Sequence, residues 1–103
     1  VLKECCYSLS KNIRNVDILG RWGGEEFLVV CPETLKDGAK DLAIKLNKAI
    51  KLHKFSTYPH SVTISVGVAS CSVNDLNYDD IIPNADKALY EAKNNGRDRV
   101  EVF

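Results

Sequence analysis

Two apolar segments separated by a pair of glycines constrain this chain more than any other feature. Residues 16–22 (VDILGRW) and 27–31 (FLVVC) each have the composition of a β-strand. Gly23 and Gly24 lie between them, and glycine adopts the positive φ angles of tight hairpin turns without steric cost. The pattern therefore predicts a β-hairpin whose turn is formed by Gly23 and Gly24.

Two acidic residues, Glu25 and Glu26, follow this turn directly. Carboxylates are hard oxygen ligands that suit a divalent cation such as Mg²⁺. The glycines carry no side chains, so the backbone and the acids can approach a ligand together. The turn is therefore a predicted site for an anionic ligand that carries a metal ion.

The rest of the chain alternates between helical and extended patterns. Apolar residues at three- and four-residue spacing predict helices over about 1–13, 39–50 and 79–94, and Gly96 follows the last of them as a stop signal. Strict alternation predicts a strand over 62–68, and a short closing strand follows near the C-terminus.

The predicted order is helix, hairpin, helix, strand, helix, strand. It fits an α+β fold, a palm-like βαββαβ (ferredoxin-like, nucleotidyl cyclase-like) sheet with helices packed on it, if the first strand is missing from these residues. That strand is central in such a sheet, so its absence is expected to leave strand edges exposed. Thr63, Ser65 and Gly67 form a small-residue face on which a helix or ligand can pack closely.

Composition describes one small soluble domain. The 103 residues are 45% hydrophobic and 27% charged, with a formal net charge of +0, so no overall basic field attracts a nucleic acid polymer or a lipid surface. No apolar run reaches the roughly 20 residues of a membrane helix. The sequence contains no methionine, which predicts that it is part of a longer protein. The spacing of the four cysteines suits neither zinc nor a disulfide framework, so we expect reduced thiols and a cytoplasmic location.

Three blocks in the right order resemble the GGDEF domain family in its GGEEF form. Residues 17–27 (DILGRWGGEEF) match the central motif, with Trp22 where Tyr or Phe is more usual; residues 62–69 (VTISVGVA) and 85–97 (ADKALYEAKNNGR) match two later blocks. The resemblance covers nearly the whole chain and identifies 1–103 as the C-terminal part of a single GGDEF domain. The front of the domain, with a further metal-binding aspartate and the residues that read guanine, is expected to lie outside these residues.

This resemblance implies a diguanylate cyclase. Such enzymes condense two GTP molecules into cyclic di-GMP across a homodimer, with release of pyrophosphate and with Mg²⁺ (or Mn²⁺) as cofactor. The chain on its own is expected to be inactive, because half of the metal site and the guanine readers are absent from it. Any membrane anchor of the parent protein is expected to lie outside this segment, which makes no direct membrane contact.

The resemblance also implies roles at the hairpin. Glu25 is the expected metal ligand, and Glu26 contributes to the metal site or to the nucleotide. Gly23 and Gly24 make the turn, clear room for the nucleotide, or do both. The alternative for both acids is that they are solvated residues of an ordinary turn and strand.

Two basic residues and an R-x-x-D motif complete the implied sites. Lys93 and Arg97 match the family's phosphate-binding pair, although a Lys and an Arg near a helix C-terminus would also complement the helix dipole. Arg14 and Asp17 match an inhibitory site that binds the product cyclic di-GMP. Their alternative is a helix-end arginine and a strand-start aspartate.

Two other functions are compatible with parts of this pattern. A non-catalytic cyclic di-GMP receptor would keep the hairpin and signal through Arg14 and Asp17, but it has no need for the metal-binding acid. A different palm-like nucleotidyl cyclase or polymerase would share the fold without the late helical block.

Overall fold

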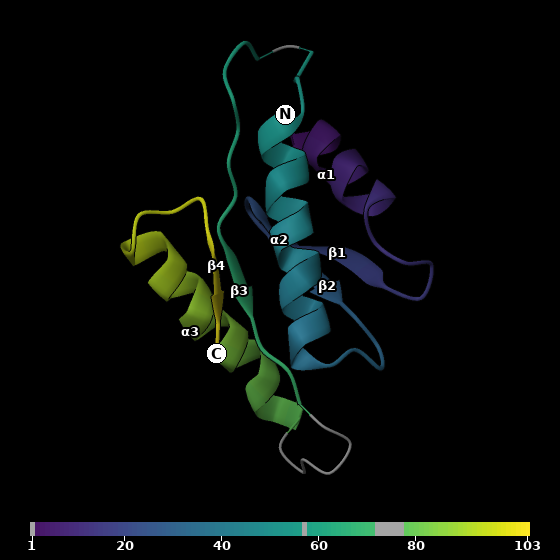
Figure 1. The fold of residues 1–103 in the computed structure, drawn as a ribbon, viewed down its shortest axis with the longest axis vertical. Coiled ribbons are helices and arrows are strands. Elements are labelled where there is room, and N and C mark those ends of the chain that lie inside the picture. Colours follow the sequence, from purple (N-terminus) through teal and green to yellow (C-terminus); the bar gives the residue numbers. More distant parts are fainter. Residues whose placement is uncertain (1, 57, 72–77) are drawn as a thin grey trace.

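The computed structural model describes residues 2–56, 58–71 and 78–103. Its elements follow the predicted order (Figure 1). They are α1 (Leu2–Lys11), β1 (Ile18–Gly23), β2 (Glu26–Val30), α2 (Lys36–Leu52), β3 (Val66–Val68), a 3-10 turn η1 (Tyr78–Asp80), α3 (Ile81–Asn94) and β4 (Val100–Val102). The α+β class and the order of the elements are therefore confirmed.

The hairpin forms as predicted, but its turn is displaced by one residue. β1 and β2 pair antiparallel, with Arg21 opposite Phe27 and an irregularity in register between Arg21 and Gly23. Gly23 is the last residue of β1, and the turn consists of Gly24 and Glu25. Of the two glycines only Gly24 has a positive φ, at 54°. The predicted turn at both glycines is wrong in this detail, because one left-handed residue is enough to reverse this chain.

In the part of the chain that the structure describes, the strands form two separate two-stranded sheets, β1–β2 and β3–β4. β3 and β4 run parallel, with Val66 opposite Val100 and Val68 opposite Val102. The predicted strand over 62–68 is too long, since only its last three residues pair with β4 and residues 61–65 have no assigned strand. A ladder needs a partner, and within the described residues none lies beside 61–65.

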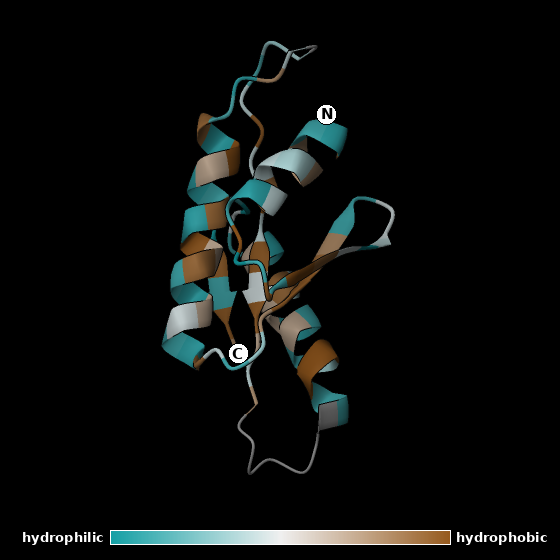
Figure 2. Cartoon of the chain, turned by 90° about the vertical axis from the view of Figure 1, so that its right-hand side faces the viewer, coloured by the Kyte–Doolittle hydropathy of each residue, from teal (hydrophilic) through white to brown (hydrophobic). Residues whose placement is uncertain are grey.

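The hydrophobic core lies between α1, α2 and the hairpin. Its buried members are Cys5, Leu9, Leu46, Ile50 and Phe55. Partly buried residues of the hairpin and of the segment before β3 pack against them. β3 and β4 contact α2 as well as α3, whereas the β1–β2 hairpin projects away from α3 in the side view of Figure 2. Helices therefore pack on both sides of the β3–β4 pair.

Gly67 brings β3 into direct backbone contact with α3. A Cβ atom added at this position would lie 2.3 Å from the carbonyl oxygen of Ala85 and 2.3 Å from the amide nitrogen of Leu89. The expectation that a helix packs closely against the small-residue face is confirmed at this position. The same contact fixes the distance between α3 and the sheet.

The four cysteines are free thiols in the structure. Burial raises the pKa of Cys5 and of Cys31. Within the described residues, no helix is both long and apolar enough to cross a lipid bilayer.

Candidate active site

The hairpin turn presents its acids on the surface. Gly24 and Glu25 are exposed, and Glu26 is half-buried at the start of β2. Arg21 holds the turn from one side, since its Nε and Nη2 atoms donate to the carbonyl oxygen of Gly24 at 2.9 and 2.5 Å. A fork-shaped donor on one carbonyl fixes the backbone while the Glu25 carboxylate stays in solvent. The turn can therefore offer an anionic oxygen to a cation.

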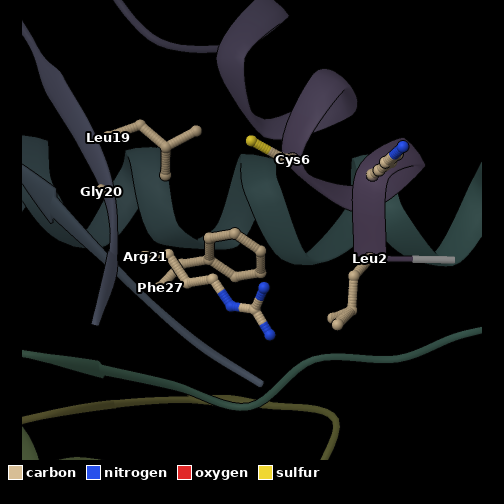
Figure 3. Close-up of a pocket in the computed structure, with 7 residues that line it drawn as sticks. Leu2, Cys6, Leu19, Gly20, Arg21 and Phe27 are labelled. Carbon is tan, nitrogen blue, oxygen red and sulfur yellow. The ribbon is translucent and has the colours of Figure 1, made fainter. Parts of the chain in front are cut away.

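A pocket of about 230 Å³ lies between α1 and the hairpin, and Arg21 is the lining residue that also bonds the turn. Figure 3 shows Leu2 and Cys6 on α1 across from Leu19 and Phe27 on the hairpin. The complete lining is Leu2, Lys3, Cys6, Leu19, Gly20, Arg21 and Phe27. Its apolar walls and the Phe27 ring suit a flat, weakly polar group, and its two basic residues suit an anion attached to that group.

Arg21 belongs to both the pocket and the turn, and we did not assign it a role from the sequence. A signal was present: alternation along β1 puts Arg21 on the same face as Leu19, which packs against the core. A charged residue in a core-facing register is uncommon and indicates a specific partner. Leu2, Lys3 and Cys6 were likewise missed, although Leu2 and Cys6 are four residues apart on one face of α1.

Lys93 and Arg97 lie together at the end of α3, and both side chains are exposed. Lys93 is in the last turn of the helix, and Gly96 ends it with a φ of 120°. The backbone N–H of Arg97 then donates to the carbonyl of Ala92 at 2.9 Å, which closes the helix terminus. The predicted stop at Gly96 is confirmed.

Arg14 and Asp17 bind each other. The Asp17 side chain is 0% exposed, and its carboxylate accepts from the backbone N–H of Arg14 at 2.9 Å and from Arg14 Nη2 at 2.9 Å. Nη2 also donates to Thr34 Oγ1 at 2.7 Å and to the carbonyl of Pro32 at 3.0 Å. These Arg14 hydrogen bonds hold the pKa of Asp17 below its usual range. Arg14 remains 54% exposed, so the guanidinium is the part of the motif that a ligand can reach.

The predicted residues thus fall into three groups. Gly23, Gly24, Glu25 and Glu26 lie together at the hairpin turn, Lys93 and Arg97 at the end of α3, and Arg14 and Asp17 at the other end of β1. No hydrogen bond or ion pair of the described residues joins one group to another. The part of the chain that the structure describes holds no cluster of three or more His, Cys, Asp or Glu side chains.

Comparison with known proteins identifies the family. Residues 1–99 match the family described as "Diguanylate cyclase, GGDEF domain". The chain belongs to this family. The resemblance seen in the three sequence blocks is therefore confirmed over nearly the whole of this GGDEF chain.

Individual relatives agree with this assignment. Diguanylate cyclase DgcP of Pseudomonas aeruginosa is 38% identical over 104 residues, which cover 99% of this chain and 15% of that protein. Diguanylate cyclase DgcM of Escherichia coli K12 is 38% identical over 100 residues, which cover 97% of this chain and 24% of that protein. The chain thus spans less than a third of the length of these curated relatives.

A solved structure confirms the fold. The active GGEEF domain of a diguanylate cyclase from Vibrio cholerae superposes with a TM-score of 0.89 at 31% identity, over 99% of this chain and 65% of that one. The nucleotidyl cyclase-like α+β fold expected from the sequence is therefore correct.

Proposed function

We propose that the protein containing this chain is a diguanylate cyclase, which condenses two GTP molecules into cyclic di-GMP. The observation that carries the proposal is the exposed Glu25 carboxylate on a turn held by Arg21, which also lines the pocket between α1 and the hairpin. One side chain thereby ties a candidate metal ligand to a candidate nucleotide pocket. The naming of the relatives as diguanylate cyclases supports the same activity.

The pocket is proposed to receive part of the nucleotide. A planar base suits the Phe27 ring and the apolar walls formed by Leu2 and Leu19. Arg21 and Lys3 supply donors that can bind phosphate or the acceptor atoms of guanine. Gly23 ends β1 without a side chain, and a Cβ at that position would meet nothing within 4 Å. The space beside Gly23 is therefore open to a ligand.

The residues at the turn fit a divalent ion, Mg²⁺ or Mn²⁺. Mg²⁺ is usually held by one or two carboxylates together with substrate phosphates and water, so the small number of acids at this turn is sufficient. Glu25 would hold the ion, and Glu26, half-buried one residue later, would support it or face the nucleotide. When bound, such an ion neutralises the phosphate charge that opposes attack.

Lys93 and Arg97 are proposed to bind the triphosphate. Both are exposed at one end of α3 and four residues apart, so they can converge on a single polyanion. Lys acts as a point charge, whereas the guanidinium of Arg can make two parallel hydrogen bonds to phosphate oxygens.

The reaction follows from bringing two such sites face to face in a homodimer. The 3′-oxygen of each GTP forms a bond to the α-phosphorus of the other. At each α-phosphorus the bond to the oxygen that bridges to the β-phosphate breaks, so two pyrophosphates leave and the ring closes. The hydroxyl proton passes to solvent or to a carboxylate. The protein contributes mainly by positioning and by electrostatic stabilisation.

The location of the protein is proposed to be the cytoplasm, because its substrate GTP is found there and the four cysteines are free thiols.

Cyclic di-GMP is further proposed to inhibit this enzyme at Arg14 and Asp17. The exposed Arg14 guanidinium can donate to guanine or to phosphate, and the buried Asp17 carboxylate fixes its orientation. Inhibition from outside the active site requires that the product bind an unproductive arrangement of the domains more tightly than a productive one.

The full-length protein tests the proposed function directly. It should convert GTP in the presence of Mg²⁺ into cyclic di-GMP and pyrophosphate in a 1:2 ratio, measured by chromatography with mass detection and a coupled pyrophosphate assay. Tight binding of cyclic di-GMP with no turnover would overturn this proposal and assign the protein as a non-catalytic receptor.

A further inference from the structure

Three consecutive residues after α3 have left-handed backbone conformations. The φ angles of Gly96, Arg97 and Asp98 are 120°, 63° and 45°. Glycine adopts such angles readily, but residues with a Cβ do so at a cost and persist there only when their surroundings hold them. Arg97 and Asp98 both have a Cβ, so something must stabilise this segment.

Asp98 provides the restraint through two residues of α2. Its Oδ1 accepts from Asn47 Nδ2 at 3.1 Å, and its Oδ2 lies 2.6 Å from the ammonium group of Lys51. Asn47 Nδ2 also donates to the carbonyl of Ile64 at 2.9 Å, so the anchor reaches the segment before β3. The hydrogen bonds from Lys51 and Asn47 lower the pKa of Asp98.

The backbone of Arg97 is bonded on both sides, whereas its side chain is exposed. Its N–H donates to the carbonyl of Ala92 at 2.9 Å, and its own carbonyl accepts from Arg99 Nε at 3.2 Å. The carbonyl of Arg99 in turn accepts from the N–H of Val66 at the start of β3, at 2.9 Å. The backbone is thereby fixed from α3 to the sheet. A fixed backbone at Arg97 also fixes the direction of its Cα–Cβ bond.

We infer that Asp98, held by Asn47 and Lys51, is a positioning residue that keeps Arg97 in its left-handed conformation and directs its guanidinium toward the nucleotide phosphates. The inference rests on the proposed function, since it assumes that Arg97 binds phosphate. Holding the guanidinium in place before the ligand arrives reduces the ordering that binding must supply. α2, which lies outside the predicted site groups, thereby acts on phosphate binding.

A purely structural role for Asp98 makes a different prediction. If the Asp98 contacts only stabilise the fold, their loss weakens binding of every ligand alike. If they position Arg97, their loss weakens binding only of ligands that carry the phosphates bound by Arg97. Replacing Asp98 with glycine separates the two roles, because glycine removes the side chain while accepting the φ of 45° without strain.

The test is a set of binding titrations on the full-length protein with Mg²⁺. The probes are the non-reacting α,β-methylene analogue of GTP, and guanosine, which has no phosphate. Asp98→Gly should weaken binding of the analogue about 10-fold, the value of one charge-assisted hydrogen bond, and leave guanosine binding unchanged. Asp98→Asn, which keeps an acceptor for Asn47 but loses the ion pair with Lys51, should fall between the parent and Asp98→Gly.

A double variant shows whether Asp98 acts through Arg97. In an Arg97→Ala background, Asp98→Gly should cause no further loss of analogue binding. Lys48→Ala removes an exposed charge from α2, the helix that carries Asn47 and Lys51. It is the matched control and should leave binding unchanged. Equal weakening of analogue and guanosine by Asp98→Gly, or additive losses in the double variant, would overturn the inference.

The series also separates failure of this inference from failure of the proposed function. If the parent forms cyclic di-GMP but Arg97→Ala binds the analogue as tightly as the parent, the inference about Asp98 is wrong and the proposed function stands. If the parent forms no cyclic di-GMP, the proposed function is wrong, and the titrations with the two probes still decide the inference.

Discussion

The two ends of β1 are both held by an arginine, but they are organised in opposite ways. Before the strand, Arg14 bonds a fully buried carboxylate, a carbonyl and a hydroxyl, and thereby joins the start of β1 to the residues after β2. After the strand, Arg21 bonds the carbonyl of Gly24, and the neighbouring Glu25 carboxylate is exposed.

This difference indicates where each end contributes. A carboxylate that is buried and fully hydrogen-bonded stabilises the native state, whereas one in solvent on a fixed turn remains available for a ligand. The Arg14 end therefore holds the hairpin in place, and the turn is the end that can perform chemistry. Arg14 itself has both properties, since its guanidinium is bonded on one side and exposed on the other.

The largest expected effect is at the hairpin turn, where the Glu25 carboxylate is exposed. Glu25→Gln in the full-length protein should reduce cyclic di-GMP formation by more than about 100-fold, because loss of a direct ligand should exceed the 10–100-fold effects of outer-shell partners. The side chain is exposed and the change is nearly isosteric, so the midpoint of thermal unfolding should not move. Turnover close to that of the parent would exclude Glu25 from the metal site.

Arg14→Ala tests the other end of β1, where Arg14 bonds the buried Asp17 carboxylate. It should weaken inhibition by cyclic di-GMP about 10-fold, the value of a charge-assisted hydrogen bond. It should also lower the midpoint of thermal unfolding, because the buried Asp17 carboxylate loses its guanidinium partner, so inhibition is measured below that midpoint. Thr34→Val is the control, since it removes one hydroxyl that Arg14 touches and leaves the guanidinium in place. Equal affinity of the parent and Arg14→Ala for cyclic di-GMP in calorimetric titration would show that the R-x-x-D motif only holds the hairpin.

The two glycines at the turn form a matched pair. Gly24→Ala should destabilise the protein by about 1–2 kcal/mol, because its φ of 54° is unfavourable for any residue with a Cβ. Gly23→Ala should change the unfolding free energy by less than about 0.5 kcal/mol, since Gly23 lies in β1 with open space around it. Urea unfolding measures both values.

Activity of the same pair then separates the two roles predicted for these glycines. If Gly23→Ala keeps its stability but loses GTP turnover, Gly23 clears room for the nucleotide. If it keeps both, the turn at Gly24 is the only reason for glycine at this site.

The smallest expected effect is on the pH dependence of stability. The pKa of Asp17 is lowered by its hydrogen bonds from Arg14, and the pKa of Asp98 by those from Lys51 and Asn47. Each contribution is complete above the ordinary aspartate value of about 4 and is lost as the pH falls through the lowered native value. Asp17→Asn should therefore flatten the loss of stability between about pH 5 and pH 2 in thermal unfolding, whereas a curve identical to the parent's would contradict the buried pairing.

Much of this molecule could be predicted from the sequence, because its signals are local. Helical spacing, the glycine turn and the stop at Gly96 each depend on residues close in sequence, and the structure confirms them apart from small shifts in their ends. The strand over 62–68 was predicted too long for the opposite reason. Alternation shows that a segment can be extended, but a ladder depends on a partner far away in sequence.

The residues of the candidate site likewise divide into those with local sequence signals and those joined by contacts between distant residues. The turn acids and the basic pair were visible as motifs, and Arg21 was indicated only by its core-facing register in β1. The anchor on Asp98 was not visible in the sequence. Asn47 and Asp98 are separated by 51 positions, and no pattern of spacing joins them. The self-pairing of Arg14 and Asp17 could have been expected from their three-residue separation, but the burial of Asp17 could not.

The contact at Gly67 gives this position an influence on residues it never touches. Any side chain there would act as a wedge between β3 and α3, because the backbone of Ala85 and Leu89 already occupies the place of its first carbon. The helix would have to lift from the sheet, and Lys93 and Arg97 at its far end would lift with it. The absence of a side chain at position 67 therefore sets the distance between the basic pair and the sheet.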